Sequence, residues 1–207
     1  RLAMVYSHIG LLDEAQREVA IQIAINPDNT MARFRVGVFD AYQGKFEEAV
    51  QVYKTVPEDV SPALISRNKA DALVHLGRLE EASEIVDQYL KTYPNDEGGN
   101  VTSVKAILFA KAGIREEAER TIARAIEVGK GFGHFHHTAY NIASAYAIMN
   151  MPDEAMKWLQ NAADDGFPCY SYFEIDPNLD NLRKDPRFVQ FMESGKRQME
   201  KFRMSIH

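Results

Sequence analysis

The segment Gly77-Arg78-Leu79-Glu80-Glu81-Ala82 carries the pattern that decides the fold, because similar segments recur along the chain at nearly even spacing. The four others are Gly10-Leu11-Leu12-Asp13-Glu14-Ala15, Gly44-Lys45-Phe46-Glu47-Glu48-Ala49, Gly113-Ile114-Arg115-Glu116-Glu117-Ala118 and Asn150-Met151-Pro152-Asp153-Glu154-Ala155. Their final alanines lie 34, 33, 36 and 37 residues apart. Repeats of two helices have a period of about 34 residues, so the spacing predicts five stacked helix pairs.

Each part of the segment has a physical role in a turn between two helices. Gly, or Asn in the fifth copy, can adopt the left-handed conformation that ends a helix. The acidic pair falls in the first turn of the next helix, where negative charge complements unsatisfied N–H groups. The Ala removes side-chain bulk where two antiparallel helices approach each other most closely. The first helix of each pair is therefore expected to end at the Gly, and the second to begin directly after it.

Composition and charge narrow the class of protein. The chain has 207 residues, of which 45% are hydrophobic and 26% charged, as is usual for a folded globular protein. Its 24 Lys and Arg against 30 Asp and Glu give a net charge of −6, which argues against nucleic acid as a partner. No apolar run approaches the ~20 residues needed to cross a bilayer, so we expect a cytoplasmic protein without a membrane partner. The single Cys169 cannot form an intramolecular disulfide, which fits a reducing compartment.

Gly, an apolar residue and Ala at these offsets, with Pro27 and Pro94 after two of the second helices, resemble tetratricopeptide repeats. The resemblance implies an all-α fold, a right-handed α-α superhelix. It covers residues 1–168 as five pairs, which are 1–29 (incomplete, because the chain begins within a helical pattern), 30–62, 63–98, 99–135 and 136–168. Arg115 stands where an apolar residue is usual in the family.

Residues 169–207 follow a different pattern and are expected to form a C-terminal cap. Apolar residues recur near helical spacing at Phe188, Phe191, Met192, Met199 and Phe202. A helix of this kind would cover the open end of the stack. Together with Tyr140-Asn141-Ile142-Ala143, the tail resembles the C-terminal end of tetratricopeptide modules in bacterial multidomain signalling proteins. That resemblance implies an accessory module behind a kinase, cyclase or winged-helix domain.

We find no set of residues that indicates an enzyme, a cofactor or a bound metal. The acidic pairs recur in every copy, whereas a catalytic pair occurs once in a site. His134, His136 and His137 are the one local concentration of metal-capable side chains. His136 and His137 would point about 100° apart on a helix, and no Cys or carboxylate stands nearby, so a structural or groove-lining role is favoured over adventitious metal binding.

Two further stretches are assigned structural roles. Gly129-Lys130-Gly131-Phe132-Gly133 misses the spacing of a phosphate-binding loop and is interpreted as a connection between repeats. Cys169 has no assignable catalytic partner, so we expect a buried thiol.

A stack of this kind curves into an extended concave face, which is the expected binding surface. The resemblance implies that the first helix of each pair lines it. The expected groove residues are Phe34, Arg35, Val38, Tyr42, Arg67, Asn68, Asp71, His75, Asn100, Ser103, Lys111, His137, Tyr140, Asn141 and Ser144. Arg and Asn can bond backbone carbonyls and carboxylates, and aromatic side chains can anchor apolar ones, so we expect a scaffold that binds a protein or peptide.

The predicted groove lacks one feature of some relatives in this family. Asn68 is followed in the next copy by Asn100 and Val104, which do not supply the Lys, Asn and Arg clamp of heat-shock co-chaperones in this family.

The alternative function is a self-associating module that regulates an attached signalling enzyme domain, such as a kinase, a cyclase or a transcription regulator. In that case Leu2 and Val5, with Tyr6, would form a homodimer interface at the open N-terminal end.

Overall fold

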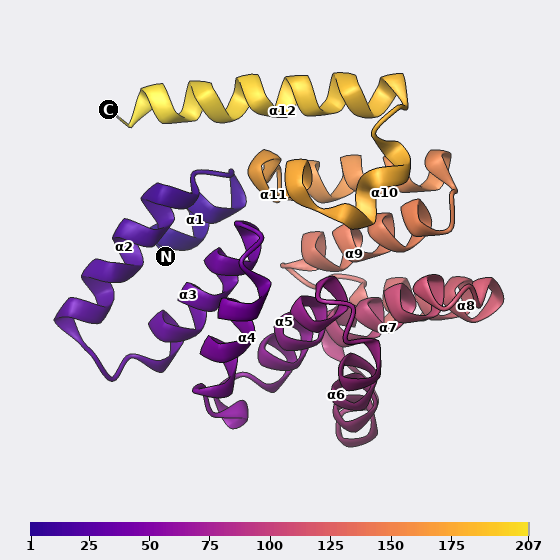
Figure 1. Cartoon of the computed structure of the whole chain (residues 1–207), viewed down its shortest axis with the longest axis horizontal. Coiled ribbons are helices and arrows are strands. Elements are labelled where there is room, and N and C mark those ends of the chain that lie inside the picture. Colours follow the sequence, from indigo (N-terminus) through magenta and orange to yellow (C-terminus); the bar gives the residue numbers. More distant parts are fainter. Residues whose placement is uncertain (207) are drawn as a thin grey trace.

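The computed structural model describes residues 1–206, and every regular element in that range is a helix. Five antiparallel pairs follow one another, namely α1 (Leu2–His8) with α2 (Leu12–Ile25), α3 (Thr30–Tyr42) with α4 (Phe46–Lys54), α5 (Pro62–His75) with α6 (Leu79–Thr92), α7 (Asn100–Lys111) with α8 (Arg115–Gly129), and α9 (Phe135–Ile148) with α10 (Pro152–Asp164). Short 3₁₀ turns, η1 (Glu58–Val60) and η2 (Glu97–Gly99), lie in two of the connections. The expected all-α superhelix is confirmed (Figure 1).

The turn inside each pair has the expected left-handed residue. The φ angles of Gly10, Gly44, Gly77, Gly113 and Asn150 are +82°, +79°, +72°, +72° and +56°. The residue after each of them donates its backbone N–H to the carbonyl five residues earlier, as Arg78 does to Leu73 at 2.9 Å. This pattern satisfies carbonyls that the helix end would otherwise leave unpaired, so the same C-terminal cap closes all five first helices.

The alanine that follows each turn is fully buried, as the spacing predicts. Ala15, Ala49, Ala82, Ala118 and Ala155 each have 0% of their surface exposed. They lie in the first turn of the second helices, where a side chain larger than a methyl group would separate the two helices of the pair.

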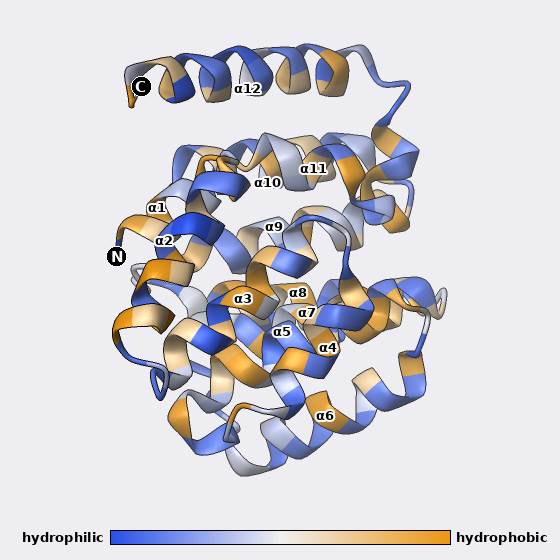
Figure 2. Ribbon diagram, turned by 60° about the vertical axis from the view of Figure 1, so that its left-hand side comes forward, coloured by the Kyte–Doolittle hydropathy of each residue, from blue (hydrophilic) through white to orange (hydrophobic). Residues whose placement is uncertain are grey.

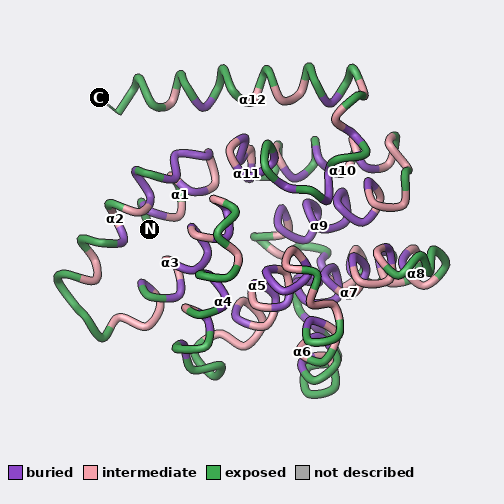
Figure 3. Tube along the Cα trace, in the orientation of Figure 1, coloured by how far each residue is buried: buried purple, intermediate pink, exposed green. Residues whose placement is uncertain are grey.

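The curvature of the stack brings the first pair close to the fifth. Figure 1 shows α1 and α2 on one side of the molecule and α9 and α10 on the other, with α11 (Tyr170–Ile175) between them. The rings of His8 on α1 and His136 on α9 have centroids 5.0 Å apart. Buried residues gather on the inner helices α5, α7 and α9, whereas α2, α6 and α8 carry many exposed residues (Figure 3).

The tail consists of α11 (Tyr170–Ile175), η3 (Pro177–Leu182) and α12 (Pro186–Ser205). The capping helix α12 is amphipathic, with hydrophilic and hydrophobic residues alternating along it (Figure 2). It runs from the fifth pair, where Arg187 pairs with Asp153 at 2.7 Å, to the first pair, where Met199 packs with Leu11. The helix therefore bridges both ends of the superhelical turn rather than covering the last pair alone.

None of the helices within residues 1–206 combines the length and the apolar character that crossing a membrane requires.

The left-handed turn can be tested at Gly77, where a new Cβ would meet no atom within 4 Å. Replacing Gly77 with Ala adds only the strain of a positive φ, so we expect the free energy of unfolding to fall by roughly 1–2 kcal/mol in urea titrations. Gly133→Ala is the matched control, because that Cβ also has free space but the φ of Gly133 is not positive. Equal stability of the two variants would contradict this account of the turn.

Candidate functional site

The inner face of the superhelix is largely filled by residues 167–178 of the chain itself, which lead from the fifth pair into the tail. Phe167, Tyr172, Phe173 and Asp176 are all buried, with Asp176 at 0% exposure. Tyr172 stacks on Tyr42 of α3 with ring centroids 4.8 Å apart. In the same way, Phe173 stacks on Tyr140 of α9, with an interplanar angle of 9° and the same centroid separation. Residues 167–178 thus occupy the position at which a bound peptide was expected.

The carboxylate of Asp176 is the polar centre of this contact. His75 Nε2 donates to Asp176 Oδ1 at 3.0 Å, and the Tyr140 hydroxyl donates to Asp176 Oδ2 at 2.5 Å. The backbone N–H of Asn178 donates to the same carboxylate at 2.8 Å. His75 Nδ1 donates to the carbonyl oxygen of Asp71 at 2.8 Å, so both ring nitrogens are engaged. Two helices of the stack therefore hold one side chain of the tail.

The buried charges of this contact stabilise one another. Burial by itself lowers the pKa of His75, but the nearby carboxylates of Asp176 and Asp71 outweigh it and raise that pKa to about 9. Burial raises the pKa of Asp176, yet the His75 charge and the bonds from His75, Tyr140 and Asn178 leave it below its usual range. Near neutral pH the contact is accordingly an imidazolium paired with a carboxylate.

Backbone contacts hold the tail in this position. The Arg183 guanidinium donates to the carbonyl oxygens of Phe173 and Asp176 at 3.0 and 2.9 Å. The Asn181 amide donates to the Ala147 carbonyl at the end of α9, at 2.9 Å. Cys169 is fully buried, as expected, and its thiol donates to the carbonyl of Ser7 at 3.1 Å. The tail is thus tied to the fifth pair and to the first.

The expected groove residues divide into three groups. Those that face the tail or the small cavity beside it are Tyr42, Arg67, Asn68, Asp71, His75, Tyr140 and Asn141. Those that lie elsewhere are Phe34 and Val38 in the core, Arg35 against Gln22 of α2, the buried Ser103 and Ser144, and Lys111 at the end of α7. Only Asn100 and His137 line the part of the inner face that stays open. Partner binding by these residues remains a prediction, and the tail already occupies the face formed by the first group.

The open part of the inner face is a groove of about 720 Å³. Its walls come from α1, from the beginnings of α5, α7 and α9, and from the end of α6. The side chains that give it an apolar, aromatic lining are Met4, Pro62, Leu64, Tyr89, Tyr93 and Phe132. The Asp96 carboxylate at its edge already accepts the backbone N–H groups of Val101 and Thr102, at 3.0 and 2.7 Å, so it caps α7.

A second cleft, of about 750 Å³, lies beneath α12. Much of its lining is formed by long polar side chains, namely Lys157, Gln160, Gln190, Gln198 and Arg187. The lining also includes apolar residues, among them Met156, Phe191 and Met192, but the long polar side chains can rotate to fill the space between α10 and α12 and cover them. The groove is therefore the better candidate for a binding site.

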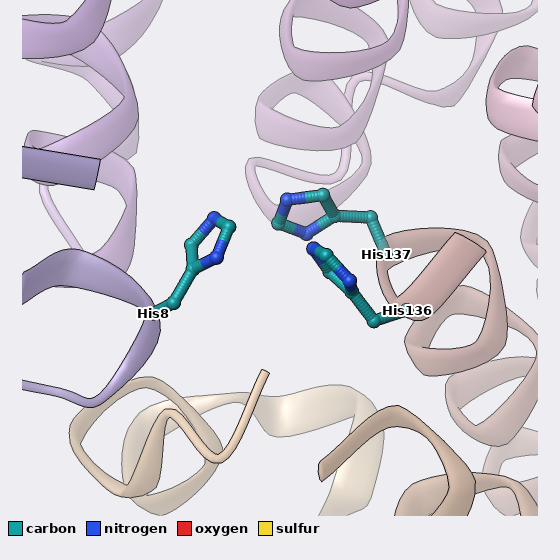
Figure 4. A group of neighbouring side chains, drawn as sticks. All are labelled: His8, His136 and His137. Atoms are coloured by element: carbon teal, nitrogen blue, oxygen red, sulfur yellow. The ribbon is translucent and has the colours of Figure 1, made fainter. Parts of the chain in front are cut away.

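A cluster of three imidazoles borders the groove (Figure 4). His8, His136 and His137 each present a ring nitrogen within 4.8 Å of the others. Burial, strengthened by the positive charge of Arg67 and of the neighbouring imidazoles, lowers the pKa of His8 to about 3. Burial likewise lowers the pKa of His136 and, further, that of His137, so all three rings are neutral near pH 7.

Comparison with known families agrees with the geometry. Two family models, both described as tetratricopeptide repeat, match the chain over residues 40–106 and 136–164. The chain is a tetratricopeptide repeat protein. The matched residues run from the end of α3 into α7 and from α9 to the end of α10. No curated protein sequence matches this chain.

Sequence reasoning missed two features of this tetratricopeptide repeat protein. Asp176 lies in the tail, and no local sequence pattern indicates that its carboxylate meets His75. His8 is separated from His136 along the chain by four repeats, and only the superhelical curvature brings them together. A lone His at the end of the first helix was the available signal, and by itself it does not predict a partner.

The buried ion pair predicts a specific dependence of stability on pH. Because the pKa of His75 is raised, its stabilising contribution is complete below about pH 6.5 and is lost as the pH rises through about 9. We expect the stability difference between the wild type and His75→Gln to shrink over this interval by roughly 2–3 kcal/mol, since one pKa unit corresponds to about 1.4 kcal/mol.

The measurement is urea unfolding of both proteins at several pH values. His134→Gln, a change at an exposed histidine, should give a profile parallel to the wild type. If the His75→Gln profile is also parallel, the ion pair does not carry the stability assigned to it.

Proposed function

We propose that the protein is an interaction scaffold that binds an extended, mainly apolar peptide segment of a protein partner in the open groove. Tetratricopeptide repeat proteins mediate protein–protein interaction, and the proposal starts from this general property of the family. Its main support is that the same inner face already holds a segment of the chain itself.

The tail indicates what this inner face recognises. It places aromatic side chains against Tyr42 and Tyr140, and the buried carboxylate of Asp176 meets His75. Recognition by stacked aromatic rings and one buried charged bond is typical of peptide anchors at protein interfaces. A partner segment in the groove would continue this mode of binding along the superhelix.

The lining of the groove favours an apolar anchor. Tyr93 is 46% exposed at the rim and packs in a tilted arrangement on Tyr89, with ring centroids 5.0 Å apart. Phe132 forms the opposite wall, packed over Gly98, and the imidazoles of His8 and His137 are neutral there. Asp96 is engaged in capping α7, and the exposed carboxylate of Glu97 is the other acidic group of the lining. A peptide with large apolar side chains and no acidic ones therefore fits best.

The groove can be tested with peptides selected from a random display library against the wild-type protein. Tyr93→Ala removes an exposed aromatic at the rim, so we expect the Kd of a selected peptide to rise at least about tenfold, as at an interface hot spot. Fluorescence anisotropy measures the change.

Ile114→Ala is the matched control, because Ile114 is 47% exposed but lies at the turn between α7 and α8, outside the groove. Peptides that bind both variants as well as the wild type would place the binding surface elsewhere and refute the groove proposal.

A second candidate function is self-association, with regulation of an attached signalling domain as its purpose. The observation that favours it is the set of exposed apolar side chains on the first helix pair, which are Leu2, Val5, Ile21 and Ile25. Ile25 is 80% exposed, and large exposed apolar surface marks protein interfaces. Tyr6 differs from the expectation, because it packs partly buried against the cluster of Leu11, Tyr170 and Met199.

Light scattering coupled to size exclusion tests the second candidate. We expect a dimer at high protein concentration and its loss in the double variant Val5→Glu, Ile25→Glu, because two buried charges would oppose the interface. Ile114→Glu, placed outside the first pair, should leave the dimer intact. A wild-type protein that is monomeric at every concentration would eliminate this candidate.

A further inference from the structure

We infer that His8, His136 and His137 form a binding site for a divalent transition-metal ion that joins the first helix pair to the fifth. The inference goes beyond the proposed peptide binding and does not depend on it. The three ring nitrogens lie within 4.8 Å of one another, and Figure 4 shows the rings of α9 facing the ring of α1. Imidazole is a preferred ligand of zinc, copper and nickel, and three His ligands with an open position are a known arrangement for zinc.

The hydrogen bonds around His136 prepare one ligand atom. Its Nδ1 donates to the backbone carbonyl of Asp165 at 3.1 Å, and the Asp165 carboxylate lies 3.8 Å from the same nitrogen. The proton therefore sits on Nδ1, and the lone pair is on Nε2. A metal-bound His commonly donates its other N–H to a carbonyl or carboxylate, which fixes the tautomer and the ring orientation in this way.

Two buried ring nitrogens of the cluster have no hydrogen-bond partner, which independently supports a bound metal. His136 Nε2 and His8 Nε2 are both buried, and neither has a hydrogen-bond partner within residues 1–206. Buried polar atoms are nearly always partnered, so two unpaired nitrogens at one place need an explanation. A shared metal ion would satisfy both, together with the ring of His137, which forms no hydrogen bond within residues 1–206.

Aromatic packing accounts for part of the cluster but not for its nitrogens. Phe167 meets His8 and His137 edge to face, with ring centroids 5.6 and 4.7 Å apart. These contacts explain why the rings are held in place. They give no partner to a nitrogen lone pair, and they provide the apolar wall that commonly surrounds a metal site.

The site has an open side and a definite charge environment. His8 and His137 also line the groove of about 720 Å³, so a fourth ligand can approach from there. The Arg67 charge acts on all three rings and weakens cation binding, whereas the Asp165 carboxylate strengthens it. The ring nitrogens must close to about 3.3 Å for tetrahedral Zn–N bonds of about 2.0–2.1 Å. His8 is only partly buried on the short helix α1, so its side chain can make this movement.

Zinc titration of tag-free, chelator-treated protein tests the site by calorimetry. We expect one equivalent of Zn²⁺ per chain in the wild type and an affinity at least about 100-fold lower in His8→Gln, since losing a direct ligand should cost no less than losing its supporting hydrogen bond. His134→Gln is the matched control, because His134 is exposed in the turn just before α9, and its affinity should stay within about threefold.

Two further measurements keep the test independent of variant folding. Zn²⁺ should raise the Tm of the wild type and of His134→Gln but not that of His8→Gln, because only the complete site joins the two ends of the superhelix. X-ray absorption of the zinc-loaded wild type should show three imidazole ligands. Absence of stoichiometric binding, fewer than three imidazoles, or equal affinity in His8→Gln would overturn the inference.

Discussion

The left-handed residue that ends each first helix constrains the whole molecule. At Gly77, with φ of +72°, the chain reverses within one residue, and the backbone bond from Arg78 to Leu73 locks the reversal. The buried alanine that follows lets the second helix return in close contact. Because the same turn recurs five times with nearly the same geometry, the small rotation between neighbouring pairs accumulates in one direction. The result is a turn of superhelix tight enough for α1 to approach α9.

A superhelix closed this far encloses polar groups that water reaches poorly, and those groups need partners within the protein. The tail meets that need. Its Asp176 pairs with His75 and Tyr140, and its aromatic rings cover Tyr42 and Tyr140. The residues from which partner binding was expected are therefore mostly engaged within the chain. What remains accessible is the groove formed by the beginnings of α5, α7 and α9.

The groove and the imidazole cluster share two side chains, His8 and His137. Any ligand that orders these rings also acts on the contact between the first and fifth pairs, because α1 and α9 each contribute to both. Binding at one place would then change affinity at the other, and by thermodynamic linkage the effect would be reciprocal. This coupling requires no long-range pathway, since the two sites have a common wall.

The sequence by itself determined the helix pairs, the position of each turn and the family, because those features depend on local chemistry: a residue that tolerates positive φ, an acidic first turn and a small residue at the point of contact. It also indicated the amphipathic capping helix, whose pattern is visible in five apolar residues. Only the tertiary structure decided that residues 167–178 fill the inner face and that His8 meets His136 and His137. Both depend on how far the superhelix turns over five pairs, a sum of small rotations between neighbours that no single segment encodes.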